Sequence, residues 1–191
     1  HLVLVQETWL NQSIQNISIP NYVELSRHDR SSGENGGGVM TFARADVKTV
    51  AHFYNPTQAE RSWHLFHLDV GTLAIANWYR PPSSALEHIA SLQVELSDLK
   101  HEVIGFILLG DMNIHHQRWL FRSNANTLEG STLKEICDDF VLQEIVRQPT
   151  RGEYLLDLCL TDLEDSECVT LLAIADHKAL LFSVNLPMPK S

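Results

Sequence analysis

The chain has 191 residues, of which 44% are hydrophobic and 20% are charged, as in a typical single globular domain. No apolar run approaches the roughly 20 residues that a membrane-spanning helix needs, which excludes such a span. The formal net charge of -10 counts against a surface built for nucleic acid, although carboxylates around a divalent cation would add charge of the same sign. The cysteines Cys137, Cys159 and Cys168 lack the spacing of a zinc site or a disulfide framework.

Segments that are apolar throughout, or that alternate between apolar and polar residues, predict β-strands along most of the chain. Glycine, proline, asparagine and serine separate these segments, as expected of turns. The predicted strands cover residues 2–6, 22–26, 38–42, 47–53, 63–70, 73–79, 104–109, 155–160, 169–174 and 179–184. The Gly-rich stretch 30–38 lacks the Walker spacing and precedes a strand, so we interpret it as a turn and not as a phosphate-binding loop.

Two segments have the spacing of helices instead. In residues 84–100, apolar side chains recur every three or four positions after Ser84 and Glu87, which are spaced as a capping box. Residues 128–140 carry a second apolar stripe. Strands followed by strands that alternate with helices predict an α+β sandwich, with two packed sheets and helices on the outside.

The first candidate for chemistry is the segment Asp111-Met112-Asn113, which follows an apolar strand directly. The two polar side chains are two positions apart and therefore emerge on the same face, at the end of a strand. An aspartate can accept a proton from water, and an asparagine can orient that water. An Asx turn that only closes the strand explains the same residues.

Acidic residues interrupt apolar surroundings at further strand ends. Glu7 ends the strand 2–6, Asp157 stands between leucines, and Asp176 with His177 separates the last two predicted strands. Each of them alone is explained by an exposed strand end. Acids are rarely placed in apolar surroundings unless they are paired or bind a metal, so their joint occurrence favours a functional site.

These positions fall in motifs whose order and spacing resemble those of the endonuclease/exonuclease/phosphatase superfamily, which includes apurinic endonucleases and DNase I. The motifs are Gln-Glu-Thr-Trp at 6–9, Asn-Trp-Tyr-Arg-Pro-Pro at 77–82, Leu-Gly-Asp-Met-Asn at 109–113, Leu-Asp-Leu at 156–158 and Asp-His at 176–177. More narrowly, His-His at 115–116, Trp119 and Pro-Thr-Arg-Gly at 149–152 resemble the apurinic-endonuclease-like domain of jockey-like non-LTR retrotransposons. The resemblance covers nearly the whole chain.

The resemblance implies a DNase I-like fold, which is a four-layered α/β sandwich of two mostly antiparallel sheets flanked by helices. The site would lie at one end of the two sheets. Glu7 would hold Mg²⁺, with Mn²⁺ as the alternative ion, and Asp176 would lie near the metal. Mg²⁺ suits such a site because it takes oxygen ligands and usually accepts only one or two protein carboxylates.

The resemblance also implies the catalytic roles. Asp111 would activate the attacking water, which Asn113 would position. His177 would donate to a phosphate oxygen, held in its tautomer by Asp157, and the hydroxyl of Tyr79 would contact the same phosphate. These roles make the chain a hydrolase of phosphodiester bonds.

The implied partner is DNA, and the implied neighbour is a reverse transcriptase domain on the same polypeptide. Thr150, Arg151 and His115 would contact the substrate. Nicking would expose a 3′-hydroxyl for target-primed reverse transcription, inside the cell and in the nucleus. No membrane partner is expected.

The family normally opens with a strand that carries an asparagine near the metal, and residue 1 already lies in the element after it. We therefore expect residues 1–191 to be a single domain that lacks this first strand. Two other functions stay open. The same fold hydrolyses other phosphate esters, and a degenerate member could bind DNA without cutting it.

Overall fold

The computed structural model describes residues 1–30, 36–47, 51–54 and 59–186. Within these residues the elements, in chain order, are β1 (Leu2–Gln6), β2 (Tyr22–His28), β3 (Val39–Arg44), β4 (Ala51–Tyr54), β5 (Glu60–Leu68), β6 (Gly71–Tyr79), α1 (Glu87–Leu99), β7 (Gly105–Asp111), α2 (Leu128–Asp139), β8 (Gln143–Glu144), β9 (Asp157–Thr161), β10 (Ser166–Ile174) and β11 (His177–Val184).

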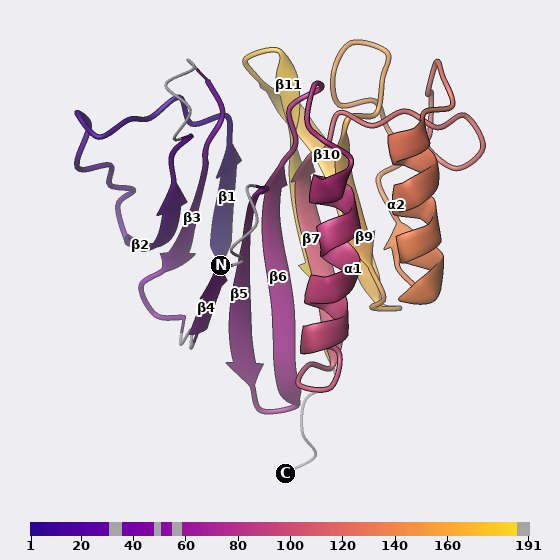
Figure 1. The fold of residues 1–191 in the computed structure, drawn as a ribbon. Coiled ribbons are helices and arrows are strands. Elements are labelled where there is room, and N and C mark those ends of the chain that lie inside the picture. Colours follow the sequence, from indigo (N-terminus) through magenta and orange to yellow (C-terminus); the bar gives the residue numbers. More distant parts are fainter. Residues whose placement is uncertain (31–35, 48–50, 55–58, 187–191) are drawn as a thin grey trace.

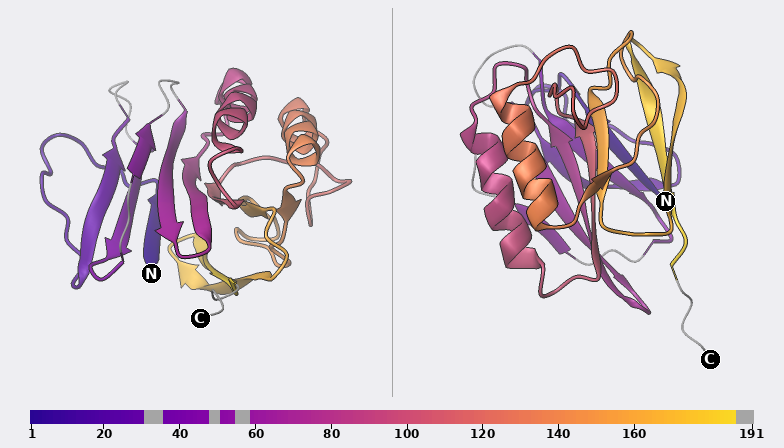
Figure 2. Two further views of the ribbon diagram at one scale, coloured as in Figure 1. Left: turned by 90° about the horizontal axis from the view of Figure 1, so that it is seen from below. Right: turned by 90° about the vertical axis from the view of Figure 1, so that its right-hand side faces the viewer.

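The strands form three sheets. One has six strands in the order β4-β5-β6-β7-β9-β8, another has three in the order β1-β3-β2, and β10 pairs only with β11. Neighbouring strands are antiparallel except β6 and β7, which are parallel because α1 connects them as a crossover. Figures 1 and 2 show α1 and α2 side by side on one face of the large sheet.

The two faces of β6 explain how the layers pack. Ala74, Ala76 and Trp78 belong to the core that contains the apolar residues of both helices. The alternate residues Leu73 and Ile75 belong to a second core, which includes leucines of β1 and β2. Successive side chains of a strand point to opposite faces, so β6 is sandwiched between the helices and the three-stranded sheet.

Asn77 joins the two sheets. It lies on the same face of β6 as Ile75, and its Nδ2 donates to the backbone oxygen of Val5 at 3.2 Å and to that of Met40 at 3.1 Å. Its Oδ1 accepts from Nε2 of Gln6 at 2.5 Å. Because Asn77 fastens the end of β1 to β6, the residues that follow each strand come close together.

The predicted α+β sandwich of packed, mostly antiparallel sheets is confirmed. Both helices cover the six-stranded sheet, and within the described residues no α-helix covers the outer face of the three-stranded one. The short strand β8 was not predicted, because two residues carry no periodicity. The predicted strand 47–53 and the Gly-rich turn 30–38 lie partly outside the described residues.

The predicted capping box is wrong. Helix α1 begins at Glu87 after Leu86, which is already helical and has no side-chain cap. Ser84 instead closes a turn by donating its N–H to the oxygen of Pro81 at 3.0 Å, and its hydroxyl contacts Nδ1 of His88 at 2.7 Å. The serine therefore belongs to the turn that precedes the helix, and the helix starts two residues later than a cap at Ser84 would place it.

Candidate active site

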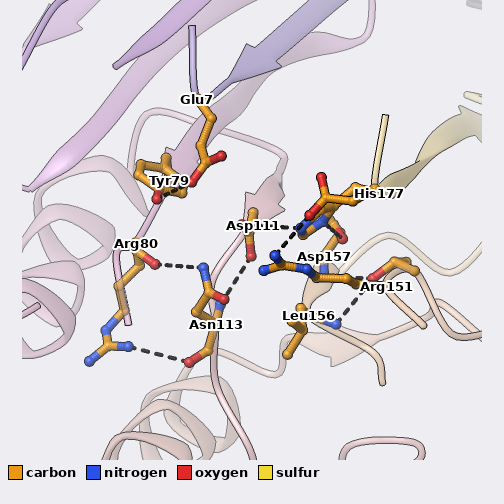
Figure 3. A network of polar contacts seen from close by, with 11 residues as sticks. Glu7, Tyr79, Arg80, Asp111, Asn113, Arg151, Leu156, Asp157 and His177 are labelled. Atoms are coloured by element: carbon orange, nitrogen blue, oxygen red, sulfur yellow. Dashed lines mark hydrogen bonds and ion pairs between the residues drawn. The ribbon is translucent and has the colours of Figure 1, made fainter. Parts of the chain in front are cut away.

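The strand ends that carry the predicted polar residues lie at one end of the sandwich, at the top of Figure 1. Glu7 follows β1, Tyr79 ends β6, Asp111 ends β7, Asp157 begins β9 and His177 begins β11. Figure 3 shows Asp111 between the Glu7–Tyr79 pair on one side and the Asp157–His177 pair on the other. The structure thus brings together five of the predicted site residues, from positions far apart in the sequence.

The two aspartates lie directly opposite each other. Asp111 and Asp157 are register partners in the antiparallel pair of β7 and β9, and both are buried, at 5% and 8% exposure. Like charges in this position repel each other. Burial, and then the charge of Asp157, raise the pKa of Asp111 from its usual 3.8 to about 7. Asp111 can therefore accept a proton near neutral pH.

His177 is tied to both aspartates. Its Nδ1 lies 2.8 Å from Oδ2 of Asp157, and its Nε2 lies 4.0 Å from Oδ2 of Asp111. The hydrogen bond with Asp157 is the main cause that raises the pKa of His177, against the effect of burial. The carboxylate of Asp157 thus favours the protonated imidazolium and fixes the orientation of the ring, whose Nε2 faces the centre of the site.

Tyr79 and Glu7 form the opposite side of the site. The hydroxyl of Tyr79 donates to Oε1 of Glu7. Burial and the neighbouring carboxylate of Glu7 raise the pKa of the Tyr79 phenol, so it remains a neutral donor. Glu7 has a φ of 49°, a conformation that non-glycine residues rarely adopt. This turn in the backbone ends β1 and directs the carboxylate toward Tyr79.

Asn113 is held against Arg80. It has a φ of 47°, its backbone N–H donates to Oδ1 of Asp111 at 3.3 Å, and its Nδ2 donates to the backbone oxygen of Arg80 at 3.1 Å. Nη1 of Arg80 donates to the backbone oxygen of Asn113 at 3.5 Å. Because the side-chain nitrogen Nδ2 of Asn113 donates to the backbone of Arg80, the side-chain oxygen Oδ1 is the atom that Asn113 can offer to a water.

The structure places the other predicted site residues around this centre and not in it. Asp176 is 65% exposed at its side chain and forms an ion pair with Arg151 at 2.8 Å. His115 lies in the loop after β7, where its Nδ1 is 3.3 Å from Oγ of Ser123. Arg151 remains partly exposed near His177, where it can contact a substrate.

Thr150 cannot contact a substrate in this structure, contrary to the prediction. The residue is 1% exposed, and its hydroxyl accepts hydrogen bonds from the backbone N–H groups of Leu156 and Asp157 at 3.1 and 3.0 Å. Its own backbone oxygen accepts from the N–H of Lys178 at 2.8 Å. Thr150 therefore fastens the start of β9 to the start of β11, and so holds Asp157 beside His177.

The carboxylate oxygens of this centre suit a divalent cation. One ligand atom each from Asp111, Asp157 and His177 lie within 4.8 Å of one another. Hard divalent cations prefer oxygen ligands, and the carboxylates of the two aspartates are of this kind. Glu7, which was expected to hold the metal, and Asp176, which was expected near it, are not members of this group.

One pair beside Tyr79 was not found by sequence reasoning. Nε of Arg30 lies 2.7 Å from Oε1 of the buried Glu60, and its Cζ lies 5.8 Å from the centre of the Tyr79 ring. Oε2 of Glu60 accepts from the N–H of Gly38 at 2.5 Å. The only cue in the sequence was the Gly-rich turn, whose contacts depend on residues distant along the chain.

Solved structures share this fold. The endonuclease domain of TRAS1, a telomere-specific non-LTR retrotransposon, has a TM-score of 0.70 at 15% identity, over 97% of this chain and 85% of that one. The AP endonuclease LMAP from Leishmania major has a TM-score of 0.78 at 15% identity, over 97% and 78%. The catalytic domain of Xenopus laevis APE2 has a TM-score of 0.67 at 14% identity, over 99% and 85%. Such identities establish the fold alone.

The fold is that of the endonuclease/exonuclease/phosphatase superfamily, as the sequence motifs predicted. The model of the endonuclease-reverse transcriptase family matches residues 73–181, more than half of the chain, and the chain belongs to this family. No curated protein matches it in sequence. In the part of the chain that the structure describes, no helix is long and apolar enough to cross a bilayer.

Proposed function

We propose that the chain is an endonuclease that hydrolyses phosphodiester bonds of DNA and requires Mg²⁺. The main support is the arrangement of Asp111, Asp157 and His177, in which a buried carboxyl of raised pKa lies beside an imidazole that a second carboxylate orients. Hydrolysis at phosphorus needs a base for the water, a donor for the phosphate oxygens and compensation of charge. The site has a group for each of these roles.

The metal would be held by the carboxylate of Glu7 and by a carboxylate oxygen of Asp111 or of Asp157. Bound there, Mg²⁺ or Mn²⁺ would neutralise charge on the phosphate and on the leaving oxygen. The hydrogen bond from Tyr79 keeps Glu7 turned toward the centre.

Asp111 accepts the proton of the attacking water. The oxygen of that water bonds to phosphorus while the bond from phosphorus to O3′ breaks, and O3′ takes up a proton from the solvent, which leaves a 5′-phosphate and a 3′-hydroxyl. The pKa of about 7 suits this role, because a base that titrates near the working pH is both deprotonated and basic enough. Asn113, fixed by Arg80, offers its amide oxygen to orient the water.

His177 stabilises the phosphate, while the single O–H of Tyr79 is donated to Glu7. The raised pKa of His177 favours a protonated ring, whose Nε2–H can donate to a non-bridging oxygen. Asp157 holds that ring through Nδ1, and Thr150 holds Asp157 in place. Arg151, which is partly exposed near His177, adds a positive charge toward the DNA backbone.

The setting that we propose is the nicking of target DNA for reverse transcription by a polymerase domain on the same polypeptide, in the nucleus. It is supported by the endonuclease-reverse transcriptase family model and by the likeness to a retrotransposon endonuclease domain. A 3′-hydroxyl at the nick is the end that a reverse transcriptase extends.

The test is incubation of supercoiled plasmid with the protein and Mg²⁺ or Mn²⁺, with EDTA as the control. The expected product is open-circular DNA that a DNA polymerase extends without further treatment. If the plasmid stays intact and another phosphate ester is hydrolysed, that ester and not DNA is the substrate. Retarded migration of intact plasmid, with no hydrolysis of any ester, would indicate a protein that binds DNA without cutting it.

A further inference from the structure

Trp9 stands exposed at the edge of the proposed site. It is 62% exposed, whereas Trp63 and Trp78 are fully buried. Single exposed apolar residues are common on protein surfaces, but an exposed indole offers a large flat face to a ligand. Trp9 follows Glu7 by two residues, so their Cα atoms are at most about 7 Å apart. The backbone of Trp9 therefore lies close to that of Glu7, and its side chain is at the surface.

The backbone holds Trp9 in an unusual conformation. Its φ is 54°, and its N–H donates to the oxygen of Gly37 at 3.0 Å. The N–H of Thr8 donates to the oxygen of Gly38 at 3.3 Å. Residues with positive φ carry strain that the surroundings must support, and such strain gathers at functional sites. The bend turns Glu7 inward and leaves Trp9 at the surface.

The Gly-rich turn is shaped to support this bend. A Cβ on Gly38 would lie 2.6 Å from Oγ1 of Thr8, and a Cβ on Gly37 would lie 2.3 Å from Nη2 of Arg30. Both glycines have positive φ, at 87° and 73°. At Gly36 a Cβ would only touch the ring of Trp9, at 3.6 Å. These glycines thus let the turn pack closely against Thr8, Trp9 and Arg30.

We propose that Trp9 stacks on a nucleobase of the DNA near the phosphate held at the site. This inference rests on the proposed function. Every base has a π-face, and stacking on an aromatic side chain contributes about 1–3 kcal/mol, or a factor of about 5 to 150 in affinity.

The test measures binding without cleavage. Short DNA duplexes are titrated in Mg²⁺ against the variant Asp111→Asn, and against the same variant carrying Trp9→Ala or Trp9→Phe. Trp9→Ala should weaken binding about 5- to 150-fold, while Trp9→Phe keeps most of the affinity. The control is Val141→Ala, which changes a residue that is 70% exposed with a φ of 57°, just after α2 at the far end of the sandwich.

A second set of duplexes carries an abasic analogue at each position in turn. At the position that Trp9 contacts, the difference in affinity between the protein with Trp9 and its Trp9→Ala variant should disappear, which a purely structural role would not produce. Equal affinities of these two proteins for intact duplexes, or equal losses for Trp9→Ala and Trp9→Phe, would overturn the proposal. If the wild type cuts no DNA but this dependence on one base persists, the stacking role stands and only cleavage fails.

Discussion

Replacing Asp111 with asparagine should stabilise the metal-free protein while it removes activity. The carboxyl of Asp111 is buried opposite Asp157, and its pKa is raised from 3.8 to about 7. The folded state therefore binds a proton more tightly than the unfolded state does. The stability that protonation provides is fully present below about pH 4 and is lost as the pH rises through 7.

The size of this effect follows from the two pKa values. Relative to the fully protonated protein, ionisation of Asp111 lowers the free energy of unfolding by about 4 kcal/mol at pH 8 and by about 2 kcal/mol at pH 5. Asparagine keeps the shape and an oxygen that can accept from the N–H of Asn113, but it carries no charge. Asp111→Asn should therefore be more stable than the wild type by up to about 4 kcal/mol at pH 8, and by less at pH 5.

The assay is urea unfolding in EDTA at both pH values, followed by tryptophan fluorescence. Asp165→Asn, which neutralises an exposed carboxylate, is the control and should change the free energy of unfolding by no more than about 0.5 kcal/mol. In Mg²⁺, Asp111→Asn should lose at least about 10²-fold in nicking rate. An Asp111→Asn protein that is no more stable than the wild type at pH 8 would refute the reasoning.

Two further predictions concern the neighbours of Asp111. Asp157→Asn keeps an acceptor for Nδ1 of His177 but removes the charge, so the pKa of His177 should fall, as measured by NMR titration in EDTA; an unchanged pKa would contradict the assigned cause. Glu7→Gln should raise the Mg²⁺ concentration needed for half-maximal nicking more than it weakens DNA binding. A Mg²⁺ titration that matches the wild type would remove Glu7 from the metal site.

The sequence was most informative where local periodicity fixes geometry. A strand of known phase shows which side chain emerges at its end, so Asp111 could be placed there. Asn113 lies beyond β7 with a φ of 47°, and its N–H donates to Oδ1 of Asp111, as in the Asx turn that was the alternative explanation. Glu7 and the Asp-His pair were found in another way, because acids are rare in apolar surroundings. Asp176 lies in the turn between β10 and β11, and His177 begins β11 and pairs with Ile174.

What the sequence could not show depends on which strands pair. The register that sets Asp111 opposite Asp157 joins residues 46 positions apart, and it explains the raised pKa of Asp111. For the same reason Thr150 was taken for a substrate contact, although its hydroxyl binds the backbone of β9. The isolated acid at Asp176 gave no sign of its partner Arg151, because both lie in loops without periodicity.

The central claim is that these strand ends form one site for cutting DNA. It is tested most directly by the rate at which supercoiled plasmid becomes open-circular in Mg²⁺, for the wild type and for His177→Ala purified in the same way. The wild type should nick the plasmid in Mg²⁺ and not in EDTA, and His177→Ala should be slower by about 10²–10³-fold with an unchanged thermal midpoint. Equal nicking rates for the two proteins would contradict the account.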